Sequence, residues 1–230
     1  MIDKVYATPD DALHDVPDGA SIMFGGFVSA GTPSNLILAL QRRGTKGITG
    51  IANNIGLGDL LDVLCEERQL AKFIATFAIR ASGTRASRFE EQYRRHEVEL
   101  ELVPQGTFVE RIRAGGAGLG GVLTRTGLGT VVQEGKQVLD VGGAEYLLEL
   151  PLRADFALIK AYRADRLGNL QYRYSGRNFN PVMATAADVV IAEVEEIVET
   201  GEIDPEDVGT PGVYVDRIVR CDPVPVRWEG

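Results

Sequence analysis

Residues 18–40 read DGASIMFGGFVSAGTPSNLILAL, and this stretch decides the predicted fold. The apolar run 22–24 predicts a buried strand, and the run from Ser34 predicts a helix with one apolar side. Between the two lie Gly25, Gly26 and Gly31, which permit turns and close approaches that a Cβ would forbid. The stretch therefore predicts a strand, a glycine loop and a helix, with the loop as a candidate binding site.

The residues of the glycine loop leave two interpretations open. The simpler one is a tight turn after a strand. The other is a ligand that approaches the loop amides, with Thr32 capping the next helix and Pro33 at its first position. Free N–H groups at that helix start would favour an anion. The spacing matches neither Gly-x-Gly-x-x-Gly nor a Gly-Lys-Ser/Thr phosphate loop. The residues alone therefore indicate an anionic ligand without identifying it.

Outward from the loop, strand-like and helix-like runs alternate over the first two thirds of the chain. The expected strands are 21–27, 48–54, 72–78 and 98–104, and the expected helices are 34–43, 59–70, 84–96 and 107–114. Alternation at this spacing is typical of an α/β fold with a mainly parallel open sheet covered by helices on both faces.

The last part of the chain has a different pattern. Seven glycines fall within 115–129, which predicts a long loop, and 137–150 predicts a hairpin that turns at Gly142 and Gly143. We further expect a strand pair over 155–165 and 168–174, a helix capped by Asn180, strands at 188–194 and 212–219, and a surface tail at 223–230. The sequence thus predicts one domain over 1–230, an α/β sheet with a small antiparallel appendage.

Composition narrows the classes of partner. The chain has 33 Asp and Glu against 24 Lys and Arg, so a nucleic acid is not an expected partner. No apolar run approaches the roughly 18 residues of a membrane span, and the N-terminus has no secretory pattern, so we expect a cytoplasmic protein. Cys65 and Cys221 are expected to be buried thiols, with a disulfide between them as the alternative, and no metal-binding spacing occurs.

A family resemblance rests on the quoted stretch. Residues 18–33 resemble the signature of the α-subunit of family I coenzyme A transferases: Asp-Gly, two free positions, three apolar residues, Gly-Gly-Phe, three free positions, Gly, one free position, Pro. Similar segments continue along the chain, among them LVPQGT at 102–107, RNFNP at 177–181 and TPGVYVDRIV at 210–219. The chain looks like the α-subunit of a 3-oxoacid, acetate/acetoacetate or 3-oxoadipate CoA-transferase, which implies the CoA-transferase-like fold.

The resemblance also implies site residues. It implies that coenzyme A, a co-substrate rather than a permanently bound cofactor, contacts Gly25, Gly26, Phe27, Val28, Ser29, Ala30 and Gly31. Asn53 matches a position that donates a hydrogen bond to the reacting oxyanion, although an Asn-Asn pair also suits a plain turn. Apart from the resemblance, Gln105 follows an expected strand and precedes an expected helix, which makes it a candidate for the same edge, with a cap or a turn as the alternative. Arg173 and Arg177 are candidates for binding a phosphate or a substrate carboxylate, with solvated charge as the alternative.

The family's nucleophile is not in this chain. Family I enzymes use a glutamate in a Ser-Glu-Asn-Gly segment of the β-subunit, and Glu-Asn-Gly does not occur here; Glu134 and Glu229, each followed by glycine, are not substitutes. The resemblance implies an α-subunit that moves coenzyme A between succinyl- or acetyl-CoA and a short-chain carboxylic or 3-oxo acid. A β-subunit would supply the glutamate in an α2β2 assembly.

A different class of function stays open on the residues alone. The fold type also resembles sugar-phosphate isomerases and ligand-sensing domains, so a non-catalytic small-molecule binding module is the alternative. A hydrolytic triad is disfavoured, because His14 and His96 are the only histidines and both fall in polar, surface-like segments.

Overall fold

The computed structural model describes residues 3–56, 60–78 and 86–224, and within them nine strands form the main sheet. The strand order is β1-β12-β11-β9-β2-β3-β4-β5, and β10 pairs with β9. Every pairing is parallel except β10 with β9. The bounds are β1 Val5–Tyr6, β2 Ser21–Phe24, β3 Ile48–Ala52, β4 Leu70–Ala75, β5 Glu99–Leu102, β9 Ala154–Asp165, β10 Leu170–Gln171, β11 Ala187–Val198 and β12 Arg217–Arg220. The predicted mainly parallel sheet is confirmed.

Helices cover both faces of this sheet, as the alternation of side chains along β2 requires. Ile22 and Phe24 pack into one buried cluster and Met23 into the other, because successive residues of a strand point to opposite faces. The first cluster is completed by α1 (Pro9–Ala12), α2 (Ser34–Arg43), the 3₁₀ helix η1 (Leu60–Cys65) and α3 (Arg88–Arg94), and the second by α4 (Gln105–Gly116) and α5 (Asn180–Ala184). None of the helices in the described ranges has the length and apolar character that a membrane crossing needs.

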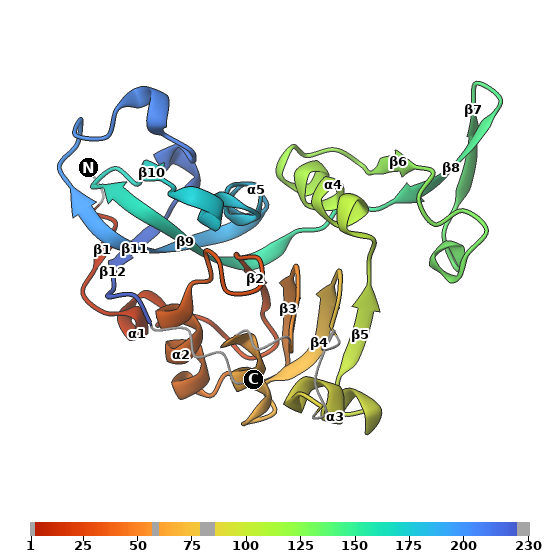
Figure 1. Ribbon diagram of the computed structural model, residues 1–230, viewed down its shortest axis with the longest axis horizontal. Helices are drawn as coiled ribbons and strands as arrows, with labels where there is room; N and C mark the ends of the chain where they lie inside the picture. The colour runs from red at the N-terminus through yellow and green to blue at the C-terminus, as the bar shows by residue number, and fades with distance from the viewer. Residues whose placement is uncertain (1–2, 57–59, 79–85, 225–230) are drawn as a thin grey trace.

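A second, three-stranded antiparallel sheet forms the appendage, which stands off the main sheet beyond α4 (Figure 1). It consists of β6 (Val122–Thr124), β7 (Val138–Val141) and β8 (Ala144–Glu149), in the order β6-β8-β7. The predicted hairpin turns at Gly142 and Gly143, which have φ values of 64° and 81°. The predicted loop over 115–129 is partly wrong, because α4 continues to Gly116 and β6 pairs with β8.

Other predicted boundaries shift for local reasons. The predicted helix 59–70 is reduced to η1, since β4 already begins at Leu70; its first residue lies outside the described ranges. The predicted strand 212–219 begins as the short 3₁₀ helix η5 (Gly212–Tyr214), and β12 starts only at Arg217. The strand expected at 168–174 shrinks to β10 and is followed by the 3₁₀ helix η3 (Tyr174–Arg177).

Further expectations concern single residues and the chain end. His14, which follows α1, and His96 are both exposed, as expected. Cys65 and Cys221 are both buried and unbridged, as expected. The expected tail falls mostly on residues 225–230, which are outside the described ranges.

Candidate functional site

The candidate residues gather at the carboxyl ends of the parallel strands. The glycine loop follows β2, Asn53 and Asn54 follow β3, and Gln105 opens α4 just after β5. Because β2, β3, β4 and β5 run parallel, these segments meet at one edge of the sheet. In open α/β sheets this is the edge where ligands bind.

Asn53 is fully buried and its side chain has a fixed orientation. Its Oδ1 accepts hydrogen bonds from Gln105 Nε2 at 2.6 Å and Thr76 Oγ1 at 3.0 Å, and its Nδ2 donates to Asn54 Oδ1 at 2.8 Å. The structure therefore brings Asn53 and Gln105 into direct contact. Among the described residues, Asn54 Oδ1 is the one acceptor that the Asn53 amide nitrogen contacts, and this nitrogen carries two N–H groups.

The glycine loop is attached to this asparagine pair. Val28 N donates to Asn54 Oδ1 at 2.9 Å, so Asn54 joins the loop to Asn53. Within the loop, Phe27 and Ala30 exchange two backbone hydrogen bonds of 3.0 Å and close a turn whose tip is Val28 and Ser29. The loop is thus ordered by its own backbone and by the end of β3.

The space beside the glycines is already filled by the chain. A Cβ on Gly25 would lie 1.8 Å from Asn180 Oδ1, and one on Gly31 would lie 2.3 Å from Gly176 O. At Gly26, where φ is +116°, a Cβ would lie 2.6 Å from Thr32 Oγ1. The fold itself therefore requires these glycines, whatever the loop binds.

Asn180 is the residue that sequence reasoning missed. The prediction that it caps α5 is wrong: Phe179 holds the cap position, and Asn180 is the first residue of the helix. Its side chain is fully buried and faces the loop. Nδ2 donates to Gly31 O at 3.0 Å and to Gly176 O at 2.9 Å, and Oδ1 accepts from Lys160 N at 2.9 Å. The Asn-Pro dipeptide suggested only a helix start, because the partners lie far away in the sequence.

The start of α2 differs from the prediction as well. Thr32 does not cap the helix; its Oγ1 donates to Val28 O at 3.2 Å, and the cap position belongs to Pro33. The free N–H groups are taken by Glu193 of β11, whose carboxylate accepts from Asn35 N at 2.7 Å and Leu36 N at 3.2 Å. Because Glu193 is fully buried here, the anion favoured by the helix start is the protein's own carboxylate.

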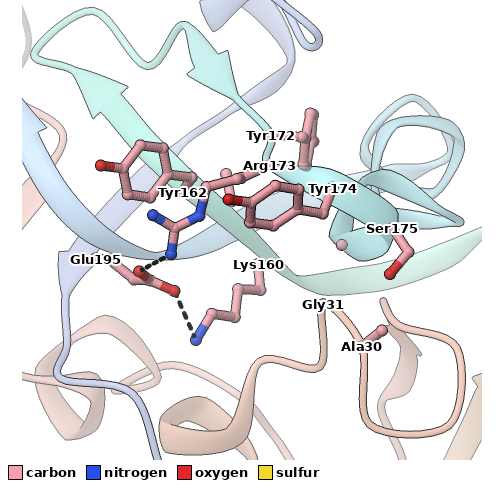
Figure 2. A pocket seen from close by; sticks show the side chains of 11 residues that line it. Ala30, Gly31, Lys160, Tyr162, Tyr172, Arg173, Tyr174, Ser175 and Glu195 are labelled. Carbon is pink, nitrogen blue, oxygen red and sulfur yellow. Dashed lines mark hydrogen bonds and ion pairs between the residues drawn. The ribbon is translucent and has the colours of Figure 1, made fainter.

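A pocket of about 210 Å³ opens beside Ala30 and Gly31 (Figure 2). The guanidinium of Arg173 lies 4.1 Å from the ring centre of Tyr162 and 5.5 Å from that of Tyr174. Glu195 pairs with Arg173 at 3.3 Å and with Lys160 Nζ at 3.8 Å (Figure 2). The charges that line the pocket are therefore paired with each other, and the pocket offers mainly aromatic and guanidinium faces.

Arg177 is set apart from these contacts. It ends η3, its side chain is exposed, and it is not among the residues that line the pocket. In the described part of the chain no carboxylate pairs with it. The structure therefore joins Asn53, Gln105 and the loop into one site and puts Arg173 in the adjoining pocket, while Arg177 stays on the surface.

Comparison with known proteins shows the family of the chain. The sequence model of a family described as coenzyme A transferase matches residues 6–220. The chain is 49% identical to one subunit of the 3-oxoadipate CoA-transferase of Acinetobacter baylyi, over 98% of both chains. It is also 49% identical to the alpha subunit of the acetate CoA-transferase of Escherichia coli, over 92% of this chain and 94% of that one.

A solved structure shows the same fold. An acyl-CoA transferase from E. coli O157:H7, in a thioester complex with CoA, superimposes with a TM-score of 0.82 at 21% sequence identity. The match covers 95% of this chain but 47% of that one, so this chain spans about half the length of the solved relative.

Proposed function

The chain belongs to the coenzyme A transferase family, and on that premise we propose that it is the α-subunit of a CoA-transferase. It works with a β-subunit to move coenzyme A from an acyl-CoA, such as succinyl- or acetyl-CoA, to a short-chain carboxylic or 3-oxo acid. The near-complete match to two proteins named as transferase subunits, one of them as the alpha subunit, supports this role.

The division of labour follows from what the chain lacks. No Glu-Asn-Gly occurs in its 230 residues, so the nucleophilic glutamate belongs to the β-subunit. That carboxylate attacks the thioester carbonyl; a C–O bond forms, the C–S bond breaks, and coenzyme A leaves as a thiolate. The thiolate then displaces the acyl group as a carboxylate and leaves a glutamyl thioester, from which the acceptor acid takes the coenzyme.

Asn53 carries the proposed contribution of this chain to catalysis. Its amide keeps one N–H for which the described residues offer no acceptor, while Gln105 and Thr76 hold its oxygen. Donated to the carbonyl oxygen that becomes negative during attack, such a fixed N–H lowers the barrier by about 3 kcal/mol. Gln105 acts by orienting Asn53 and lining the substrate site.

The glycine loop is the proposed contact for coenzyme A. Its tip, Val28 and Ser29, and the exposed ring of Phe27 stand at the same sheet edge as Asn53. Arg177, an exposed cation without a carboxylate partner in the described ranges, is available for a phosphate or a substrate carboxylate.

Several finer properties belong to the same proposal. Residues 1–230 act as one domain, two copies join two β-subunits in an α2β2 enzyme, and the enzyme works in the cytoplasm. The acceptor is a short-chain 3-oxo acid or acetate, the two kinds of substrate in the names of the relatives.

A coenzyme exchange assay tests the proposed function. The chain is assayed alone and after assembly with a candidate β-subunit that carries Ser-Glu-Asn-Gly, using succinyl- or acetyl-CoA with acetoacetate, 3-oxoadipate or acetate. We expect exchange only in the assembled pair, and a loss of about 100-fold in kcat for Asn53→Ala. Exchange by the chain alone would overturn the divided active site.

A further inference from the structure

Asn178 and Asn180 hold consecutive carbonyl groups of the glycine loop. Asn180 Nδ2 donates to Gly31 O at 3.0 Å, and Asn178 Nδ2 donates to Ala30 O at 2.9 Å. We propose that these two asparagines are positioning residues, which fix the 25–31 loop in its binding shape before a ligand arrives. The link from this shape to coenzyme A rests on the proposed function.

Only a neutral amide satisfies all the groups around Asn180. Its nitrogen gives one proton to Gly31 O and one to Gly176 O, while its oxygen accepts from Lys160 N on β9. An aspartate at this position has no proton to donate to either carbonyl at neutral pH. An alanine leaves all three backbone groups without a side-chain hydrogen-bond partner. Since Asn180 is fully buried, water does not readily replace these bonds.

Asn178 extends the same arrangement by one residue. Its Nδ2 also donates to Ser175 O at 2.8 Å, and its Oδ1 accepts from Phe179 N at 2.7 Å. The 175–180 segment is thereby folded against the loop, and it supplies Ser175 and Gly176 to the wall of the pocket. The shape of the loop and the shape of the pocket are therefore set by the same two side chains.

The loop is held from the opposite side too, by Asn54 on Val28 N at 2.9 Å. The loop has fixed points at Val28, Ala30 and Gly31, and its Phe27 ring, 42% exposed, packs edge-on against Phe77. A loop ordered in advance loses little conformational entropy when it binds, so its ligand is held more tightly. Releasing Ala30 and Gly31 should therefore weaken ligand binding more than it slows the reaction of bound substrate.

Gln69 provides a matched control at the other end of the sheet. It is also fully buried, and its Nε2 donates to two backbone carbonyls, Leu40 O at 2.9 Å and Thr45 O at 3.1 Å. Gln69→Glu makes the same chemical change as Asn180→Asp. Its bonds join the end of α2 to the start of β4, far from the glycine loop.

The test compares both variants, assembled with the β-subunit, by amide hydrogen exchange and by steady-state kinetics. For Asn180→Asp we expect exchange at residues 27–31 to be at least about tenfold faster than in Gln69→Glu. We also expect about a tenfold higher KM for the acyl-CoA, with kcat within about threefold. Loop exchange equal in the two variants would overturn the positioning role.

A milder variant keeps the test decisive if Asn180→Asp does not fold. Asn178→Ala removes the bonds with Ala30 O, Ser175 O and Phe179 N and the 3.4 Å contact with Asn180 Nδ2. The Asn180 amide, which holds Gly31 O and Gly176 O, stays in the chain, and we expect about threefold faster exchange at Ala30 and Gly31. Unchanged exchange there would count against the proposal. A wild-type pair with no coenzyme exchange would refute the proposed function instead, while the amide measurements would still decide what Asn178 and Asn180 do.

Discussion

The two ends of the main sheet use the same kind of contact for different purposes. At the amino end, Gln69 holds two backbone carbonyls, and the carboxylate of Asp155 accepts from Ser21 N at 2.8 Å and Ser21 Oγ at 2.7 Å. At the carboxyl end, Asn54 and Asn180 likewise hold backbone groups of the glycine loop. A buried amide bonded to backbone therefore does not by itself mark a site.

The two ends of the sheet differ in the groups and spaces that these hydrogen bonds leave open. At the amino end they join β4 to the turn after α2, and β2 to β9, so they bind the core elements together. At the carboxyl end they leave a pocket, the exposed ring of Phe27 and an N–H of Asn53 with no acceptor in the described ranges. The amino end also keeps an unused polar atom, because Gln69 Oε1 is buried and has no hydrogen-bond partner among the described residues. The pocket and the exposed ring of Phe27 are therefore what distinguish the carboxyl end.

The largest expected effect is a glycine substitution that contrasts the two ends. Gly25→Ala puts a methyl group 1.8 Å from Asn180 Oδ1, so either the loop or α5 must move, and we expect a loss of about 3 kcal/mol in unfolding free energy. Gly19→Ala, at the amino end, meets open space, and its φ of +79° costs only about 1–2 kcal/mol. Urea unfolding of both variants measures these losses in unfolding free energy. Equal losses for Gly25→Ala and Gly19→Ala would contradict the difference between the two ends of the sheet.

A smaller effect is expected from the carboxylates at the two ends. Glu193→Gln removes the buried negative charge that accepts from Asn35 N and Leu36 N at the start of α2, at a cost of about 2 kcal/mol. Asp18→Asn changes an exposed acceptor of Lys46 N in an amino-end turn and should cost about 0.5 kcal/mol. Chemical denaturation measures both; a cost for Asp18→Asn that matches Glu193→Gln would contradict the comparison.

The smallest expected effect is the contribution of Asp155, at the amino end, to the pH dependence of stability. The backbone N–H and hydroxyl of Ser21 hold the pKa of Asp155 below its ordinary value of 3.8. A lowered folded-state pKa gives stability that is complete above the unfolded value and is lost as the pH falls through the folded value. Because Asp155 is exposed, we expect no more than about 0.5 kcal/mol.

The control for this pH dependence is Ser21→Ala, which removes the hydroxyl and keeps the backbone N–H. It should raise the Asp155 pKa in part in an NMR titration. It should also make the acid limb of the stability curve slightly less steep, since the lowered pKa values of Asp15 and Glu101 contribute to that limb as well. The amides of Asn54 and Asn180 do not titrate, so loop exchange at the carboxyl end should not follow the same curve. If Ser21→Ala left the stability curve at acid pH unchanged, Asp155 would not be a source of this pH dependence.

The sequence was sufficient wherever the information is local. The apolar run 22–24, the hairpin glycines Gly142 and Gly143, and the position of the glycine loop all follow from neighbouring residues, and the structure agrees. Asn53 and Gln105 each follow an expected strand, which makes both candidates for one sheet edge, and the parallel strand order explains why they meet.

The misses have a common physical cause. The caps expected from Thr32 and Asn180 were inferred from adjacent residues, but a helix start in the interior takes its partners from the whole fold. Glu193 is 158 positions from Asn35, and Asn180 reaches Gly31 across 149 positions. No periodicity or short motif carries such a pairing.

The fit between Asn180 and the glycines also limits how this protein can be altered. A side chain at position 25 needs a shorter residue at 180, and that residue no longer serves the carbonyls of Gly31 and Gly176. Saturation mutagenesis at one of these positions should return almost only the parental residue. A library that varies positions 25, 31, 176 and 180 together is the one that can yield a working loop of a new shape.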